Sequence, residues 1–171
     1  LRTVDGISNL KLFSVSNLPE SQEVEPNNTR EQVAALTLPV CVSGAIPPED
    51  VDVFAFHAGA GQTLAFEVEG LRLGDALFDP RLAVLDAGGG ERAVADDVPL
   101  LRQDAAIVHT FAAEGTYFVQ VRETAYGGGG NFWYRLHAGS FPRPTACIPS
   151  AFQTGATGQV TWLGDATLST Q

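Results

Sequence analysis

The chain has 171 residues, with 20 acidic against 10 basic side chains and therefore a formal net charge of −10. This balance argues against a nucleic-acid partner, because binding phosphates requires clustered Lys and Arg. No apolar run approaches the roughly 20 residues of a membrane span, so we expect a soluble chain without membrane insertion. The length suits one domain with a substantial core. Since Met is absent, we expect the sequence to be a piece of a longer polypeptide.

The first 30 residues predict a short strand followed by a linker. Across Gly6–Val15 (GISNLKLFSV), apolar residues alternate in part with polar ones, which is compatible with a strand. The next stretch, Leu18–Arg30, reads LPESQEVEPNNTR. It is polar, contains two prolines and lacks apolar periodicity, as linkers do. A short helical turn is predicted over residues 29–35, where Asn28 or Thr29 is a suitable N-cap.

The middle of the chain is a series of short runs in which every second residue is apolar. Turn stretches rich in Gly, Asp and Pro separate the runs, and this pattern is typical of half-buried antiparallel strands. Eight such strands exceed what one flat sheet needs, so we expect an all-β fold with two antiparallel sheets packed face to face. The predicted strands are Leu36–Ile46, Asp52–Ala58, Gln62–Glu69, Arg81–Asp86, Arg92–Asp96, Ala105–Phe111, Thr116–Glu123 and Asn131–Ala138.

The same alternation predicts which side chains face the core, because successive side chains of a strand point to opposite faces. The residues expected to point inward are Leu64, Phe66, Val68, Tyr117, Val119, Val121, Tyr134 and Leu136. Those expected to point outward are Thr63, Ala65, Glu67, Glu69, Phe118, Gln120, Arg122, Trp133, Arg135 and His137.

Past Gly139 the alternation stops. The stretch SFPRPTACIPSAF is interrupted by three prolines, and a last strand is predicted over Gln159–Leu163.

The two cysteines leave two possibilities open. Cys41 and Cys147 are far apart in the sequence and match no metal-ligand spacing such as C-x-x-C. In an oxidising compartment, a disulfide closing that loop would add about 4–5 kcal/mol in the chain-entropy description. The alternative is two small buried thiols.

Oxygen-bearing side chains gather in two places that flank the first predicted strand. The linker motif E-x-E-P-N-N contains Glu23, Glu25 and Asn27, and Asp50 and Asp52 stand at the entry of the second strand. Carboxylates brought together without a cation repel, whereas Ca²⁺ takes six to eight oxygens at about 2.3–2.6 Å. The alternative from spacing alone is a solvated acidic linker.

Several stretches together resemble one family, the bacterial pre-peptidase C-terminal domain. They are EVEPNNTREQVAALTLPVCVSGAI, EDVDVFAFHAGAGQTLAFEV, PRLAVLDAGG, GTYFVQV and FWYRLHAG, which run from about Glu23 to Gly139. The most specific parts are E-x-E-P-N-N, the D-x-D-x-F-x-F strand at Asp50–Phe56 and the G-x-Y strand at Gly115. The resemblance implies a jelly-roll-like β-sandwich that is secreted, is appended to enzymes or repeated in surface proteins, and has no catalysis of its own.

The resemblance also implies a calcium site. In the calcium-binding members, which include the collagen-binding domains of clostridial collagenases, the linker motif and the D-x-D strand supply the metal ligands. Carried onto this sequence, the implied ligands are Glu23, Glu25, Asn27, Asp50 and Asp52.

The collagen-binding members use a row of tyrosines, and this chain departs from that row. The strand after Gly115 offers Tyr117, Phe118, Gln120 and Arg122 instead, so collagen binding is not expected. The remaining candidate for a binding patch is an outward-facing Trp133, because an exposed Trp is a frequent interaction anchor. Its expected neighbours are Phe118, Arg122, Tyr126 and Arg135. The alternative is that Trp133 packs under a flanking segment.

Both ends of the chain resemble pieces of immunoglobulin-like modules of the transcription-factor type. GISNLKLFSV is similar to the last strands of one, and PSAFQTGATGQVTWLG to the opening of another. The expected organisation is an end fragment (1–18), an acidic linker (19–30), the sandwich (31–140) and a start fragment of a following module (141–171). Neighbouring modules of the same polypeptide are the expected partners.

Catalytic motifs are not found. There is no G-x-S-x-G elbow, and His57, His109 and His137 each lie singly in a predicted strand. We therefore expect a noncatalytic, secreted or cell-surface accessory module, stabilised by calcium and acting as a spacer or adhesion unit. The alternatives are a carbohydrate- or protein-binding module using an exposed aromatic face, and a processing or chaperone segment of a secreted peptidase.

Overall fold

The computed structural model describes residues 2–4, 6–7, 12–99, 101–142, 144 and 146–163. Strands dominate them, and the helical part is a single 3-10 turn, η1 (Leu71–Leu73). No helix in these ranges is long and apolar enough to cross a membrane. The strands are β1 (Arg2–Thr3), β2 (Gly6–Ile7), β3 (Glu20–Gln22), β4 (Val40–Ala45), β5 (Val51–Ala58), β6 (Thr63–Glu69), β7 (Pro80–Leu85), β8 (Glu91–Ala95), β9 (Ala106–Thr110), β10 (Gly115–Glu123), β11 (Trp133–Gly139), β12 (Ala146–Ile148) and β13 (Thr161–Leu163).

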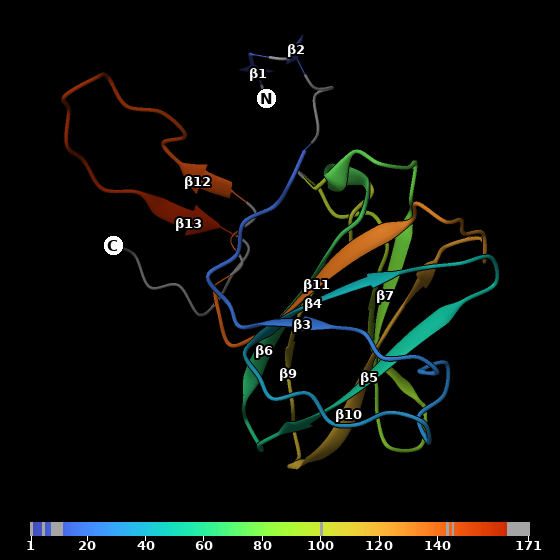
Figure 1. Cartoon of the computed structure of the whole chain (residues 1–171). Helices are drawn as coiled ribbons and strands as arrows, with labels where there is room; N and C mark the ends of the chain where they lie inside the picture. Colours follow the sequence, from blue (N-terminus) through green and yellow to red (C-terminus); the bar gives the residue numbers. More distant parts are fainter. Residues whose placement is uncertain are drawn as a thin grey trace.

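Two sheets packed face to face form the body of the molecule (Figure 1). Their strand orders are β3-β4-β11-β6-β9 and β5-β10-β7-β8. The hydrogen-bonded pairs β4·β11, β5·β10, β6·β9 and β7·β8 are nested in the sequence and alternate between the sheets, which is the jelly-roll arrangement. Each of the eight predicted runs overlaps one of the strands β4 to β11, so the predicted all-β sandwich is confirmed.

The core between the sheets is apolar and rich in aromatic rings. Phe56 lies 4.9 Å from Phe66 between ring centroids, and Phe111 lies 4.5 Å from Tyr117. Side chains of both sheets interdigitate here because each strand presents alternate residues to this layer. The predicted inward residues all belong to this core or pack against it: Leu64, Phe66, Val68, Tyr117, Val119, Val121, Tyr134 and Leu136.

Both outer faces are partly covered, so four of the residues predicted to face outward are buried on those faces instead of exposed: Ala65, Glu67, Phe118 and His137. Phe118 is only 8% exposed; it packs with Val53, Ala83 and Leu85 on the outer face of the β5-β10-β7-β8 sheet, where Val33 covers this group. On the other sheet, Glu67 is buried.

Glu67 is buried because the loop containing η1 folds back over it. Arg72 Nη2 lies 2.5 Å from Glu67 Oε1, and Arg72 Nε lies 2.5 Å from Asp104 Oδ2. Asp104 Oδ1 also accepts the backbone N–H of Gly70 at 3.0 Å and of Leu71 at 2.7 Å. Each of the two buried carboxylates thus has a basic partner, as buried charged groups require.

The chain between β3 and β4 differs from its prediction in two respects. Residues 29–35 form no helix; the backbone makes one turn, in which Gln32 N donates to Thr29 O at 3.1 Å, and then runs extended, with Ala35 bridged to Ala55 of β5. The stretch predicted as a linker also includes β3, which pairs parallel with β4. The chain is extended at Ala35 because the backbone next to it bonds to the edge of β5, where Leu36 N donates to Ala55 O at 2.7 Å.

The ends form two small separate sheets, β1-β2 and β12-β13. Of the predicted strand at Gly6–Val15, the structure has Gly6–Ile7, while residues 8–11 lie outside the described part. The predicted strand at Gln159–Leu163 is present as Thr161–Leu163. The immunoglobulin-like origin of these ends stays a prediction. Cys41 and Cys147 are free thiols in the structure, the first buried and the second half-buried.

Candidate metal centre

The two groups of predicted ligands meet at the side of the sandwich where β5 begins. The linker runs alongside β4 as far as Glu23, whose N–H donates to Ser43 O at 3.0 Å. It then crosses to β5, where Val53 N donates to Asn27 O at 2.9 Å. The E-x-E-P-N-N segment therefore lies against the D-x-D start of β5. Residues that are about 25 positions apart in the sequence become neighbours only because the linker crosses from one sheet to the other.

Three carboxylates form the centre of this site, which we name the carboxylate cluster: Glu25, Asp50 and Asp52. One oxygen from each lies within 4.8 Å of the others. Two unit charges at that separation repel by about 3 kcal/mol at an effective dielectric constant of 20. Asp52 is 0% exposed and Asp50 is 8% exposed, so water screens little of the repulsion between these two, whereas Glu25 is exposed. The fold therefore gathers three carboxyl groups at one partly buried point.

The protonation of Asp52 reflects that environment. Burial is the largest cause that raises its pKa, to about 9, and the charges of Glu23 and Asp50 act in the same direction. The hydrogen bond from Tyr134 opposes the rise. Without a cation Asp52 is therefore protonated at neutral pH, and a cation bound next to it would favour the charged form.

Several buried polar atoms of the site have no hydrogen-bond partner among the described residues. They are Oδ1 and Nδ2 of Asn27, Oδ2 of Asp50 and Oδ1 of Asp52. Buried polar atoms almost always have a partner, and leaving one unpaired costs about 1–3 kcal/mol. Three of these four atoms are oxygens, so the residues present fit a hard cation that binds oxygen ligands.

The linker itself holds two of the carboxylates in place. Asn27 N donates to Glu25 Oε2 at 2.9 Å, and Asn28 Nδ2 donates to Asp50 Oδ1 at 2.6 Å. The first bond is local and the second joins the linker to the start of β5. Together they fix the two segments relative to each other.

Glu23 lies behind the cluster and supports it. Its Oε1 accepts the Ala45 N–H at 2.9 Å, and its Oε2 accepts the hydroxyl of Tyr134 at 3.1 Å. The same hydroxyl contacts Asp52 Oδ2. Of the five predicted ligands, the structure brings Glu25, Asp50 and Asp52 together as a group, places Asn27 beside them through the Glu25 contact, and uses Glu23 as a link to β4.

Tyr134 is a site residue that the sequence analysis assigned only to the core. Its ring is fully buried, and burial together with the charges of Asp52 and Glu23 raises the pKa of its hydroxyl well above the usual value. The phenol is therefore a permanent hydrogen-bond donor in this site. Alternation predicted its inward direction, but the period-two pattern does not reveal what the hydroxyl meets.

The predicted aromatic patch is split between the two sheets. Trp133 is 51% exposed on β11, whereas Phe118 is buried on the outer face of the other sheet. Arg122 and Tyr126 do lie together, with the guanidinium 4.1 Å from the ring centroid. Trp133 and Phe118 therefore do not belong to one surface, because the core lies between their faces.

A second group of titratable residues lies on the outer face of the five-stranded sheet. His137 Nε2 lies 3.4 Å from Glu69 Oε2. Burial opposes the charged form of His137, but contacts with Cys41 and Glu69 raise its pKa to about 9. Burial also opposes the charged form of Glu69, yet the contact with His137 lowers its pKa to about 2. Since Cys41 is fully buried, no substrate reaches its thiol, and the group does not resemble a working nucleophile.

Comparison with known proteins confirms the resemblance to the bacterial pre-peptidase C-terminal domain. Residues 50–123 match the family model of that description, and the match starts at the first aspartate of the cluster. Over 100 residues the chain is 31% identical to a probable subtilase-type serine protease of Deinococcus radiodurans, an alignment that covers 57% of this chain and 14% of that protein. Residues 50–123 are therefore similar to this family, and the chain spans a small part of the curated relative.

One solved structure shares the fold. The crystal structure of the pre-peptidase C-terminal domain of a collagenase from Bacillus anthracis superposes with a TM-score of 0.50 at 16% identity, covering 66% of this chain and 99% of that one. Aeromonas hydrophila PliG, a periplasmic inhibitor of g-type lysozyme, gives a TM-score of 0.48 at 14% identity, covering 71% of this chain and 96% of that one.

Proposed function

We propose that this chain is a noncatalytic accessory module of a secreted or cell-surface multidomain protein, and that bound Ca²⁺ ties its linker to the sandwich. The observation that carries the proposal is the carboxylate cluster with its unpaired buried oxygens. The family match supports the accessory role, because the relatives it points to are a subtilase-type protease and a domain of a collagenase.

The residues that would hold the ion come from both segments. Glu25, Asp50 and Asp52 offer carboxylate oxygens, and Asn27 offers its amide oxygen. The ion would supply positive charge that offsets the mutual repulsion of the carboxylates. Oxygen donors without any nitrogen or sulfur favour Ca²⁺ over Zn²⁺ or copper. Glu23 and Tyr134 position Asp52 without being needed as ligands.

The role of the metal would be mechanical. The linker carries Glu25 and Asn27, and the sandwich carries Asp50 and Asp52, so one ion would join the two segments. The direction in which the preceding chain leaves the sandwich would then be set. We propose on this basis that the module acts as a spacer or adhesion unit whose geometry depends on extracellular calcium.

A melting experiment tests the proposal. At calcium concentrations about 100-fold above Kd, binding to the folded state adds about 2.7 kcal/mol. For a domain of this size that corresponds to an increase in Tm of about 5–10 °C relative to EDTA. Asp50→Asn should remove most of this increase. The exposed Asp97→Asn, which changes the net charge equally, should retain it. Equal Tm values in Ca²⁺ and in EDTA for the unmodified chain would refute the proposed binding of Ca²⁺.

A second candidate function rests on the exposure of Trp133. A half-exposed Trp on a strand is suited to stack on a sugar ring or to anchor a protein contact. If this face binds, Trp133→Ala should abolish signals that the unmodified chain gives on a glycan or matrix-protein array, with the exposed Phe13→Ala as control. Full binding by Trp133→Ala would show that the face carrying Trp133 is not the binding surface. A processing or chaperone role within a secreted peptidase stays a further prediction.

A further inference from the structure

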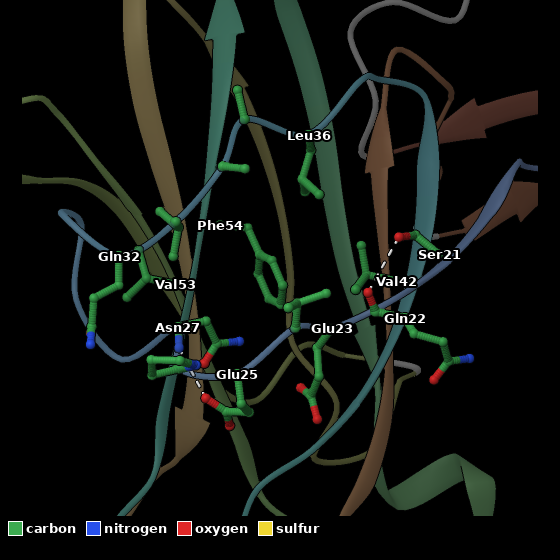
Figure 2. Close-up of a pocket in the computed structure, with 15 residues that line it drawn as sticks. Ser21, Gln22, Glu23, Glu25, Asn27, Gln32, Leu36, Val42, Val53 and Phe54 are labelled. Atoms are coloured by element: carbon green, nitrogen blue, oxygen red, sulfur yellow. Dashed lines mark hydrogen bonds between the residues drawn. The ribbon is translucent and has the colours of Figure 1, made fainter.

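We propose that the module binds an extended peptide segment of a partner protein, which adds as a further strand to β3. The binding space, here named the edge trough, has a volume of about 500 Å³ and lies between residues 21–27 and residues 32–36 (Figure 2). Val42, Val53 and Phe54 line it from the sandwich. An apolar floor between two extended segments suits a side chain of a peptide.

Backbone hydrogen bonds hold both walls of the edge trough. The first wall is fixed at Glu23, whose N–H donates to β4, and at Asn27, whose carbonyl accepts from Val53 of β5 at 2.9 Å. The second wall is fixed at Leu36, whose N–H donates to Ala55 O at 2.7 Å. Because these residues anchor the walls, a ligand has to order only the short segments between the anchors, which lowers the cost of binding.

The first wall contains an open strand edge. Toward β4, β3 uses Pro19 O, which accepts from Cys41 N at 2.8 Å, and Glu23 N. Backbone groups along a strand alternate in direction, so the N–H of Gln22 points away from β4. In the part of the chain that the structure describes, β3 is the last strand of its sheet. An open edge of this kind is the template for strand addition.

Charge determines which peptide fits. Glu23 and Glu25 line the edge trough, and the whole chain has a net charge of −10. An approaching segment with Lys or Arg next to apolar residues would be attracted, and an acidic segment would be repelled. The occupant is therefore an extended segment with alternating apolar residues and flanking basic residues.

The calcium dependence of this binding rests on the proposed function, because Glu25 and Asn27 belong both to the trough wall and to the proposed metal site. A metal that fixes these residues also fixes the wall. We therefore expect the peptide to bind more tightly with Ca²⁺ than with EDTA. By linkage, the peptide should raise the affinity for Ca²⁺ by the same factor.

Fluorescence anisotropy with the full chain provides the test. The probe is a fluorescein-labelled peptide of sequence Lys-Val-Thr-Val-Thr-Val-Lys, titrated in Ca²⁺ and in EDTA. Two further probes serve as controls, one with both Lys replaced by Glu and one with the central Val replaced by Pro. We expect binding of the first probe only, because the second is repelled and the third lacks a backbone donor. These controls do not depend on the folding of any variant.

Two proline variants then locate the binding edge. Gln22→Pro removes the outward N–H of β3 and leaves its bonds to β4 intact. Val108→Pro is the matched control on β9, the opposite edge of the same sheet. Phe111, which follows β9, donates its N–H to Gln62 O just before β6. By alternation from Phe111, the N–H of Val108 points outward. Proline is tolerated at such edge positions. Loss of one hydrogen bond predicts about tenfold weaker binding for Gln22→Pro, with no change for Val108→Pro.

The outcomes separate this inference from the calcium proposal. Absence of binding by the lysine probe, or equal affinity of Gln22→Pro and the unmodified chain, overturns the strand addition, whether or not Ca²⁺ raises the Tm. If the lysine probe binds equally well in Ca²⁺ and in EDTA, and Ca²⁺ does not change the Tm, the proposed calcium site is refuted. The proposed peptide site is then still supported.

Discussion

At the scale of single residues, the site depends on a position that has no side chain. Gly44 of β4 lies opposite Tyr134 of β11 in the sheet register. A Cβ atom at this position would lie 2.1 Å from Glu23 Oε2 and 2.4 Å from the Tyr134 ring. Glycine is therefore required here to let the linker carboxylate and the buried phenol approach each other.

Gly44→Ala should destabilise the domain. The added methyl group must displace Glu23 or Tyr134, and overpacking of this kind costs about 1–3 kcal/mol. Gly130→Ala is the matched control, because a Cβ at Gly130 meets nothing within 4 Å. Urea denaturation measures both free energies of unfolding. Similar values for the two variants would show that the site tolerates a side chain at position 44.

At the scale of elements, the outer face of the five-stranded sheet carries charged residues that are paired. His137 of β11 and Glu69 of β6 form a largely buried ion pair, and Arg135 Nη1 donates to Ser14 O at 2.6 Å. The Arg135 contact holds Ser14 on the sheet. Partners of opposite charge explain why polar residues predicted to face water are half-buried or buried here.

The His137–Glu69 pair predicts how stability depends on pH. The pKa of Glu69 is lowered to about 2, so its contribution is present above the unfolded pKa of 4.5 and is lost as pH falls through 2. The pKa of His137 is raised to about 9, so its contribution is present below the unfolded pKa of 6.5 and is lost as pH rises through 9. The pair therefore stabilises most between about pH 4.5 and 6.5.

Glu69→Gln should remove the acid limb of the pH profile of Tm and weaken its alkaline limb, which persists in part because Cys41 also raises the pKa of His137. The control is Glu114→Gln, which removes an exposed pair with His57 at 3.7 Å and should change the profile little, since exposed pairs contribute little. Thermal melts between pH 3 and pH 10 measure the profiles. A Glu69→Gln profile parallel to that of the unmodified chain would contradict the role of the pair.

At the scale of the whole molecule, the nested pairing of strands creates the site. The first and last strands of the jelly roll, β4 and β11, carry Gly44 and Tyr134, and the next nested pair contributes Asp52 from β5. The linker then crosses the open side between β4 and β5 (Figure 1). The same crossing forms the carboxylate cluster and one wall of the edge trough, so the two proposed sites share their structural origin.

Much of the fold was predictable from local pattern. The alternation of Leu64, Phe66 and Val68 depends on the strand geometry alone, so it identified the inward face without knowledge of any partner. The D-x-D and E-x-E-P-N-N motifs likewise indicated oxygen donors. The burial of Phe118 and Glu67 was not predictable, because each is covered by a segment that reaches it only after folding.

The sequence alone was enough to predict β4 to β11, their inward faces and the kinds of donor atoms available, since these follow from side-chain types at short spacing. The tertiary structure decided which strands pair, that Glu25 meets Asp50 and Asp52, and that Tyr134 supports them from the core. Such meetings bring together residues far apart in the chain, and their geometry depends on how the two sheets close. No short stretch of sequence contains that information.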